Sequence, residues 1–263
     1  MLVFTMFYRC VLLRRMPEIP DQIHVVVPVW NDSARLSKFG PELVRECAAA
    51  GLPIRLVIAD DGSDASEAPR LRELCQSFSA VWPGCSVHWV GKHRGKGGVL
   101  RDAWSHAQDA SWLAFVDADG STSAGDFVGL VQHALNQGCS VLGVRRRTAD
   151  TVVRESWIRG LTHRGFLTVA QLLLGLNASD PQCGAKVFKA ADYRKIEMDL
   201  REDGLAFDCE ILIRMQERGC RWIEMPVSWF EAKGGKVRLL RDAPRMLAAL
   251  FRIRAGRRDS RKT

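Results

Sequence analysis

The sequence lacks several patterns that would assign it to a class at once. No run approaches 18 consecutive apolar residues, so no transmembrane helix is predicted. No two of the eight cysteines lie within four residues of one another, which excludes a CxxC redox motif and a zinc knuckle. The pattern favours reduced, mostly buried thiols in a cytosolic compartment. Internal repeats, low-complexity tracts and a Pro/Ser-rich linker are also missing, which favours one folded domain.

The formal net charge of +8 is concentrated at the two ends of the chain. Between Lys233 and Thr263 there are eleven basic and two acidic residues, and the first sixteen residues carry three arginines and no acid. The body between them is therefore mildly acidic. This distribution indicates that the two ends of the chain attract anions and the body does not. It favours an anionic membrane surface over nucleic acid as the partner.

The N-terminal segment MLVFTMFYRCVLLRRM is apolar but interrupted by Arg9. It is too short for a secretory signal, whose charges precede the apolar run. Two interpretations stay open: an interfacial segment, or sequence upstream of a start at Met16.

Apolar β-branched runs alternate with helical patterns over the first half of the chain. Strands are predicted at 23–29, 54–60, 86–91, 112–119 and 140–145, with helices at 33–50, 66–78, 99–110 and 124–137. This alternation predicts an α/β fold with a mostly parallel, Rossmann-like sheet flanked by helices. Later elements are a helix at 152–176, a strand at 184–189, a helix at 206–218 and a strand at 221–230.

Polar side chains directly follow four of these strands. Parallel α/β sheets bind ligands at the carboxyl ends of their strands, so these positions are candidate binding residues. Singly, each motif has a plain alternative: DDGSD is typical of a turn, GKGG lacks the P-loop spacing, and DADG has Val128 where a calcium loop needs a glutamate. Together they are more specific. Asp117 and Asp119 form a clamp for Mg²⁺ or Mn²⁺, and a neighbouring basic loop can neutralise phosphate. The combination predicts a nucleoside-diphosphate site.

Six segments, in order, resemble family 2 glycosyltransferases of the GT-A fold: VVVPVWND, VIADDGSD, RGKGGVLRDAW, FVDADGS, DPQCGAKVF and FDCEIL. Within that family they are most similar to the dolichyl-phosphate β-glucosyltransferase and dolichol-phosphate mannose synthase branch, over roughly residues 23–255. The resemblance implies a nucleotide-sugar donor, Mg²⁺ or Mn²⁺, and a polyprenyl-phosphate lipid acceptor.

The resemblance also implies roles for individual residues on the donor side. The nucleotide-sugar contacts carried over by position are Pro28, Trp30, Asp32, Asp60, Asp61, Lys96, Asp117 and Ala118. The implied metal ligands are Asp117, Asp119 and Ser121. Trp30 stands where the family has Tyr, Asp32 where it has Glu, and His93 where it has Asn.

On the acceptor side the resemblance implies a clamp on the lipid phosphate, carried by Arg145, Arg154, Arg159, Gln182 and Lys236. Their alternative is a solvated run of charge. The implied catalytic set is Asp119, Asp208, Arg145 and Arg159. Asp208 is a candidate general base, although acids are also common in the first turn of a helix. Cys183 is read as a packing residue and not as a nucleophile.

The segment DAPRMLAALFRIRAG predicts a C-terminal basic amphipathic helix, with Asp242 as its N-cap and Gly256 after its end. Ala243, Leu247, Leu250 and Phe251 are predicted on one face. Such a helix is typical of a membrane-surface element, and its alternative is an ordinary helix packed on the domain. The predicted divisions are an extension at 1–20, a GT-A domain at 21–235 and the basic helix and tail at 236–263.

The resulting hypothesis is an inverting transferase that moves a hexose, glucose from UDP-glucose, to a polyprenyl phosphate. It is expected to lie peripherally on the cytoplasmic face of a membrane. Two alternatives stay open: a family 2 enzyme with a non-lipid saccharide or small-molecule acceptor, and a nucleic-acid-binding protein that uses the basic tail.

Overall fold

The computed structural model describes residues 22–232 and 239–259, without the side chains of residues 158, 159, 239–241, 258 and 259. The predicted N-terminal extension lies outside the described residues. The elements in chain order are β1 (Ile23–Val29), α1 (Ser33–Ala50), β2 (Ile54–Asp60), α2 (Glu67–Val81), β3 (Cys85–Trp89), α3 (Lys96–Ser105), β4 (Trp112–Val116), α4 (Ala124–Gln137), β5 (Ser140–Arg145), β6 (Val153–Arg154), α5 (Trp157–Leu174), β7 (Ala185–Lys189), α6 (Ala190–Arg194), the 3₁₀ helix η1 (Glu197–Asp199), α7 (Phe207–Glu217), β8 (Trp222–Val227), β9 (Trp229–Phe230) and α8 (Leu239–Asp259).

Seven strands form one sheet in the order β3-β2-β1-β4-β7-β5-β8. β7 runs antiparallel to β4 and β5, and the other neighbouring pairs are parallel. A second, two-stranded sheet pairs β6 with β9. The predicted mostly parallel α/β fold is therefore confirmed. The alternation of strand and helix produces it because each helix returns the chain to the same edge of the sheet.

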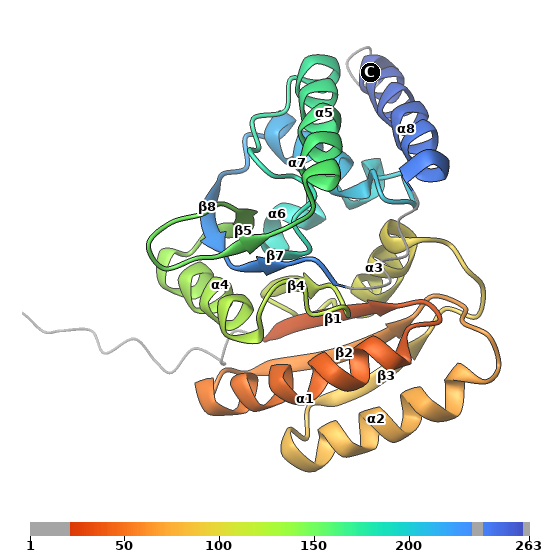
Figure 1. Ribbon diagram of the computed structural model, residues 1–263, viewed down its shortest axis with the longest axis vertical. Helices are drawn as coiled ribbons and strands as arrows, with labels where there is room; N and C mark the ends of the chain where they lie inside the picture. The colour runs from red at the N-terminus through yellow and green to blue at the C-terminus, as the bar shows by residue number, and fades with distance from the viewer. Residues whose placement is uncertain (1–21, 233–238, 260–263) are drawn as a thin grey trace, which may run out of the picture.

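Helices cover both faces of the large sheet (Figure 1). One hydrophobic cluster lies under α1, α2 and α4, and the other lies under α3, α5, α6, α7 and α8. The continuous apolar runs of β1 and β4 are explained by this arrangement, since a strand covered on both faces has side chains in both clusters. The ends of β1, β2 and β4 that the functional site needs are thereby fixed in a rigid framework.

Several predicted boundaries were wrong. α3 begins at Lys96, three residues before the expected start. Gly97 and Gly98, which were expected in a glycine-rich loop, are buried residues of the first turn of this helix. A Cβ at Gly97 would lie 2.5 Å from the Cβ of Phe207. The expected helix at 152–176 is shorter, and α5 covers Trp157–Leu174. Val153 and Arg154 before it form β6, which pairs with β9.

The C-terminal helix is present but longer than predicted. α8 begins at Leu239, so Asp242 lies inside its first turn and is not the N-cap, and Gly256 lies within the helix. The predicted single apolar face is also divided. Leu250 is buried in the core, whereas Leu247 and Phe251 are 41% and 54% exposed. The helix packs against α5 (Figure 1). Its apolar residues are therefore shared between a face that packs on the domain and a face exposed to solvent.

The predicted boundaries at 20/21 and 235/236 stay predictions. In the part of the chain that the structure describes, no helix combines the length and the apolar character needed to span a bilayer.

Candidate active site

A cavity of about 600 Å³ opens at the carboxyl ends of β1, β2 and β4. It brings together most of the donor-side residues that the sequence predicts, namely Pro28, Trp30, Asp32, Asp61, Lys96, Asp117, Ala118 and Asp119. These residues come from four segments far apart in the chain. Their convergence follows from the parallel sheet, because the carboxyl ends of its strands meet at one edge.

The aromatic wall of the cavity is a stacked pair. The rings of Trp30 and His93 lie 4.1 Å apart between centroids, with planes 23° apart. His93 Nδ1 in turn lies 2.8 Å from Asp61 Oδ2. His93 therefore has a position in the site, which the sequence revealed only as a departure from the family pattern. A flat aromatic surface of this kind can stack on a nucleobase.

The two acids after β2 have different surroundings. Asp61 is buried and accepts the backbone N–H groups of Arg94 and Gly95, at 2.7 and 2.8 Å. It therefore holds the glycine-rich loop over the cavity. The Asp60 carboxylate accepts the N–H of Ser63 at 3.2 Å and stabilises the turn that follows β2.

Arg35 joins two of the predicted acids and was missed by the sequence reasoning. Its Nε donates to Asp32 Oδ1 at 2.7 Å, and its Nη1 lies 3.4 Å from Asp119 Oδ2. Burial alone would lower the pKa of Arg35, but the hydrogen bonds and charge of Asp32 outweigh it, so the pKa is raised. The signal was the i, i+3 spacing to Asp32 at the start of α1.

The acids of the DxD motif lie on the floor of the cavity. Asp117 Oδ1 is 3.0 Å from Lys96 Nζ, and Asp119 Oδ1 accepts the N–H of Ser121 at 2.9 Å. Burial raises the pKa of Asp117, Lys96 opposes this, and the charges of Asp119 and Asp208 add to the rise. A divalent cation would relieve this repulsion.

The residues around Asp117 fit Mg²⁺ or Mn²⁺. Gly184 provides the space, because a Cβ there would lie 2.2 Å from Asp117 Oδ2. The carboxylate oxygens of Asp117 and Asp119 are the donor type that both ions prefer. The side chain of Ser121 is buried next to them, and its role as a further ligand stays a prediction.

Asp208 is held by two lysines. Its Oδ2 lies 3.2 Å from Lys96 Nζ, and its Oδ1 lies 3.2 Å from the Nζ of Lys186. Lys186 is fully buried on β7 and also donates to the carbonyl of Cys183 at 2.5 Å. The sequence showed Lys186 only as a charge within an apolar strand. Burial raises the pKa of the Cys183 thiol to about 11, which agrees with a packing role.

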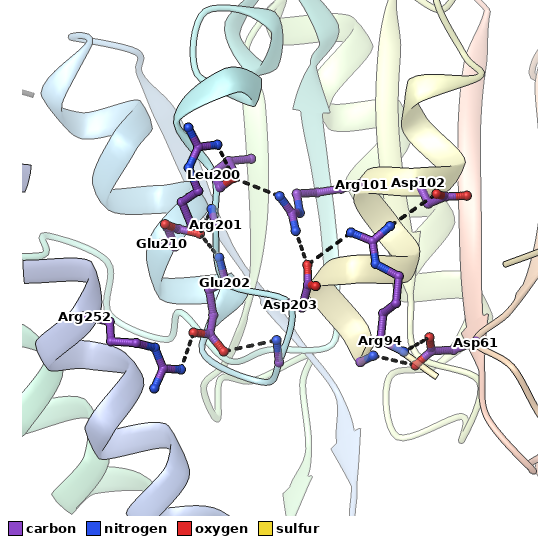
Figure 2. Close-up of polar contacts among 12 residues, drawn as sticks. Asp61, Arg94, Arg101, Asp102, Leu200, Arg201, Glu202, Asp203, Glu210 and Arg252 are labelled. Atoms are coloured by element: carbon purple, nitrogen blue, oxygen red, sulfur yellow. Dashed lines mark hydrogen bonds and ion pairs between the residues drawn. The ribbon is translucent and has the colours of Figure 1, made fainter. Parts of the chain in front are cut away.

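A loop and a helix that were not expected at the site close the other side of the cavity. Glu202 accepts from Arg252 of α8 at 2.8 Å, and Asp203 accepts from Arg101 of α3 (Figure 2). Behind the loop, the buried Glu210 accepts the N–H groups of Arg201 and Glu202. The α8 residues in the cavity lining are Asp242, Arg245, Met246, Ala248 and Arg252. Two basic residues of α8, Arg245 and Arg252, therefore line the cavity.

A second cavity, of about 730 Å³, lies between β5 and α5, and among the described residues Arg145 is the one predicted acceptor residue in its lining. Arg145 lines it but also forms a bidentate pair with Asp180, with Nε 2.8 Å from Oδ2 and Nη2 2.7 Å from Oδ1. Asp180 also accepts the backbone N–H of Arg145 at 2.9 Å. Burial would raise the pKa of Asp180, but Arg145 lowers it to about 2.

Other predicted acceptor residues are placed less centrally. Gln182 lies near His163, whose Nδ1 lies 3.0 Å from Arg145 Nη2. Arg154 is exposed and lies over the ring of Phe230, at 5.9 Å. Lys236 and the side chain of Arg159 lie outside the described residues. The arginines that the sequence reasoning missed and that line this cavity are Arg146, Arg147 and Arg164.

Comparisons with known proteins identify the family and the fold. The sequence profile described as Glycosyl transferase family 2 matches residues 24–197. The chain is 28% identical over 247 residues to the dolichyl-phosphate beta-glucosyltransferase of Saccharomyces cerevisiae, covering 88% of this chain and 74% of the relative. It is 29% identical over 245 residues to the enzyme of the same name from Dictyostelium discoideum, covering 88% and 73%.

A solved structure with the same fold is glucosyl-3-phosphoglycerate synthase from Mycobacterium tuberculosis, in complex with Mn²⁺, UDP-glucose and phosphoglyceric acid. The TM-score is 0.62 at 18% identity, and the match covers 90% of this chain and 80% of that one. The predicted GT-A fold and family resemblance are thus confirmed.

Proposed function

Because the chain belongs to glycosyl transferase family 2, we propose that it is an inverting, metal-dependent enzyme that transfers glucose from UDP-glucose to a polyprenyl phosphate. The observation that carries the proposal is the convergence of Trp30, Asp61, Lys96, Asp117 and Asp119 in one cavity. An aromatic surface, acids and a lysine are the groups that a nucleoside diphosphate sugar requires. The names of the relatives support the lipid acceptor.

On the donor side, each group has a defined task. Trp30 stacks on the uracil, and Asp61 holds the loop that carries Arg94 and Lys96 against the phosphates. Bound to Asp117 and Asp119, Mg²⁺ or Mn²⁺ would supply Lewis acidity for the departing diphosphate. Lys96, already paired with Asp117, adds positive charge at the same place.

On the acceptor side, a phosphate is the nucleophile. It is anionic at neutral pH, so the reaction needs little help from a general base. This agrees with the surroundings of Asp208, whose two oxygens are each paired with a lysine. The arginines of the second cavity, Arg145, Arg146, Arg147 and Arg164, position the lipid phosphate for attack on the anomeric carbon.

Membrane attachment in this proposal is peripheral and on the cytoplasmic face. α5 and α8 pack together and expose apolar side chains next to basic ones. Trp157 and Leu172 of α5 are each 78% exposed, and Leu247 and Phe251 of α8 are also exposed. Apolar residues flanked by arginines favour an anionic lipid surface. Flotation with anionic vesicles, absent with neutral vesicles, is the expected result.

The test of the proposed activity is transfer of radiolabel. The purified chain is incubated with Mn²⁺, a polyprenyl phosphate in detergent and labelled UDP-glucose, GDP-mannose or dTDP-glucose. We expect label from UDP-glucose to pass into the organic phase. Asp119→Ala should abolish transfer, whereas Asp109→Ala, which changes an exposed acid paired with Arg55, should retain it. Label that reaches only water-soluble products would favour a non-lipid acceptor, and full activity of Asp119→Ala would overturn the proposed mechanism.

A further inference from the structure

A second group of metal-ligating side chains lies on the outer side of α3, outside the cavity lining. Among the described residues, the ligand atoms of His88, Asp102 and His106 all lie within 4.8 Å of one another. His88 comes from the edge strand β3, and Asp102 and His106 come from α3 and the residue that follows it. Because Asp102 and His106 are four residues apart, the helix places them on the same face.

His88 and Asp102 are already joined by one hydrogen bond, whose proton a metal ion would displace. His88 Nε2 lies 2.7 Å from Asp102 Oδ2, and the two imidazole rings are 4.9 Å apart between centroids. His106 Nδ1 lies 2.9 Å from the backbone carbonyl of Asp102. Since a carbonyl only accepts, Nδ1 carries the proton and Nε2 keeps its lone pair. An imidazole N–H held by a carbonyl is the arrangement that fixes a histidine for metal binding.

The separations between the ligand atoms, from 2.7 Å to at most 4.8 Å, bracket those around a bound ion. Zn²⁺ lies about 2.0–2.2 Å from nitrogen and oxygen ligands, so neighbouring ligands in a tetrahedral site are about 3.4 Å apart. The 2.7 Å contact must open slightly and the longer separations must close. Side-chain rotation has room for this change, because His88 and Asp102 are 21% and 30% exposed and His106 is exposed. The same exposure provides the path by which an ion enters.

We propose that His88, Asp102 and His106 form a divalent transition-metal site, separate from the DxD acids, that binds Zn²⁺ and its relatives Co²⁺ and Ni²⁺. The two imidazoles decide the class of metal, since nitrogen ligands suit these ions and all-oxygen sites suit Mg²⁺ and Mn²⁺. Asp102 Oδ1 is already 3.3 Å from Arg94 Nη1. The carboxylate therefore offers Oδ2, and water completes the coordination.

The site is connected to the donor cavity through Arg94. Figure 2 shows the Arg94 guanidinium between Asp102 and Asp203, and the backbone N–H of Arg94 donates to Asp61. A cation on Asp102 competes with Arg94 for that carboxylate. The side chain of Arg94 therefore links the metal site to the glycine-rich loop that covers the donor.

The first experiment measures Zn²⁺ binding to the full chain in excess Mg²⁺, by competition with a chromogenic chelator. We expect one equivalent in the native protein, and binding weaker by a factor of about ten or more in His88→Ala and His106→Ala. His133→Ala, on α4, and Asp117→Asn, at the DxD motif, should both retain it. Circular dichroism and thermal melting establish that each variant is folded.

A second experiment identifies the ligands. Co²⁺ bound at this site should give visible d–d bands without the near-ultraviolet charge-transfer band of a thiolate ligand, and His106→Gln should remove them. The proposal is overturned if the native chain binds no Zn²⁺, if folded His88→Ala and His106→Ala variants bind it as the native chain does, or if the cobalt complex shows thiolate ligation. Because Asp117→Asn tests the DxD motif separately, a failure here leaves the proposed transferase activity intact.

Discussion

The ammonium group of Lys96 lies between two carboxylates, 3.0 Å from Asp117 Oδ1 and 3.2 Å from Asp208 Oδ2. One carboxylate belongs to the DxD motif and the other to the first turn of α7. Lys96 thus connects the segment after β4, which holds the implied metal ligands, to the first turn of α7. Both carboxylates raise the pKa of Lys96 against the opposing effect of its burial, so it stays charged at neutral pH.

Replacing Lys96 with Met should therefore weaken both the fold and the donor site. It leaves Asp117 and Asp208 facing each other without their shared cation, at a cost on the order of 3 kcal/mol in the free energy of unfolding. Affinity for UDP should fall by about tenfold or more. Urea unfolding and calorimetric titration with UDP measure the two effects. Lys92→Met, an exposed lysine of the same loop, is the matched control, and unchanged UDP affinity in Lys96→Met would contradict this role.

The missing side chain at Gly184 gives a prediction about the metal. In Gly184→Ala the new Cβ would lie 2.2 Å from Asp117 Oδ2 and 2.7 Å from Asp117 Cγ, so the carboxylate must move. We expect the Mn²⁺-dependent part of UDP binding to fall at least about tenfold. The measurement is UDP binding with Mn²⁺ and with chelator.

Gly125→Ala is the control for that experiment, because nothing lies within 4 Å of a Cβ at Gly125 in α4. The exchange should stabilise the helix by about 0.5–1 kcal/mol and leave nucleotide binding unchanged. Mn²⁺-dependent binding in Gly184→Ala equal to that of Gly125→Ala would show that Asp117 does not need this space.

The sequence predicted the first half of the fold closely. The bounds of β1, α1, α4 and β5 agree with the prediction, because each has a clear start or end signal. Gly51 and Gly138, for example, close α1 and α4 in the left-handed conformation that glycine adopts readily. Ser123 caps α4 by accepting the N–H of Asp126.

The later elements depended on contacts between distant segments. The antiparallel insertion of β7 between β4 and β5 leaves no mark in the period of the sequence, because a strand buried on both faces reads the same in either direction. Lys186 could be recognised as a site residue only once β7 placed it beside Asp208. Likewise, the division of α8 into inward and outward apolar residues depended on α5 packing against it.

The pair between Asp180 and Arg145 should make a large contribution to stability. Both side chains are buried, 6% and 9% exposed, and the contact is bidentate. Asp180→Asn removes the charge that compensates Arg145, and we expect a loss of about 3–5 kcal/mol in the free energy of unfolding. Asp150→Asn, in an exposed loop, should change it by less than about 0.5 kcal/mol. Equal stability of the two variants would refute the assignment.

The same pair predicts sensitivity to acid. The pKa of Asp180 is about 2 in the folded protein, below the value of about 3.9 in an unfolded chain. The stability it provides is therefore fully present above pH 4 and is lost as the pH falls towards 2. Asp180→Asn should lose less stability than the native protein between pH 4 and pH 2.5, as measured by urea unfolding. A parallel decline in both proteins would contradict the prediction.

His24 on β1 predicts a separate loss of stability at a higher pH. Its burial, with the nearby charge of Arg55, lowers its pKa from 6.5 to about 4. The unfolded chain therefore binds a proton between pH 6.5 and pH 4 that the folded protein does not, so stability must fall as the pH falls through this window. The expected loss between pH 7 and pH 5 is about 2 kcal/mol, and His24→Gln should lack this part of it. Urea unfolding at the two pH values measures the difference, and the NMR titration of the His24 ring should have its midpoint near 4. A midpoint near 6.5, or an equal loss in His24→Gln, would show that the folded protein accepts the proton at this position.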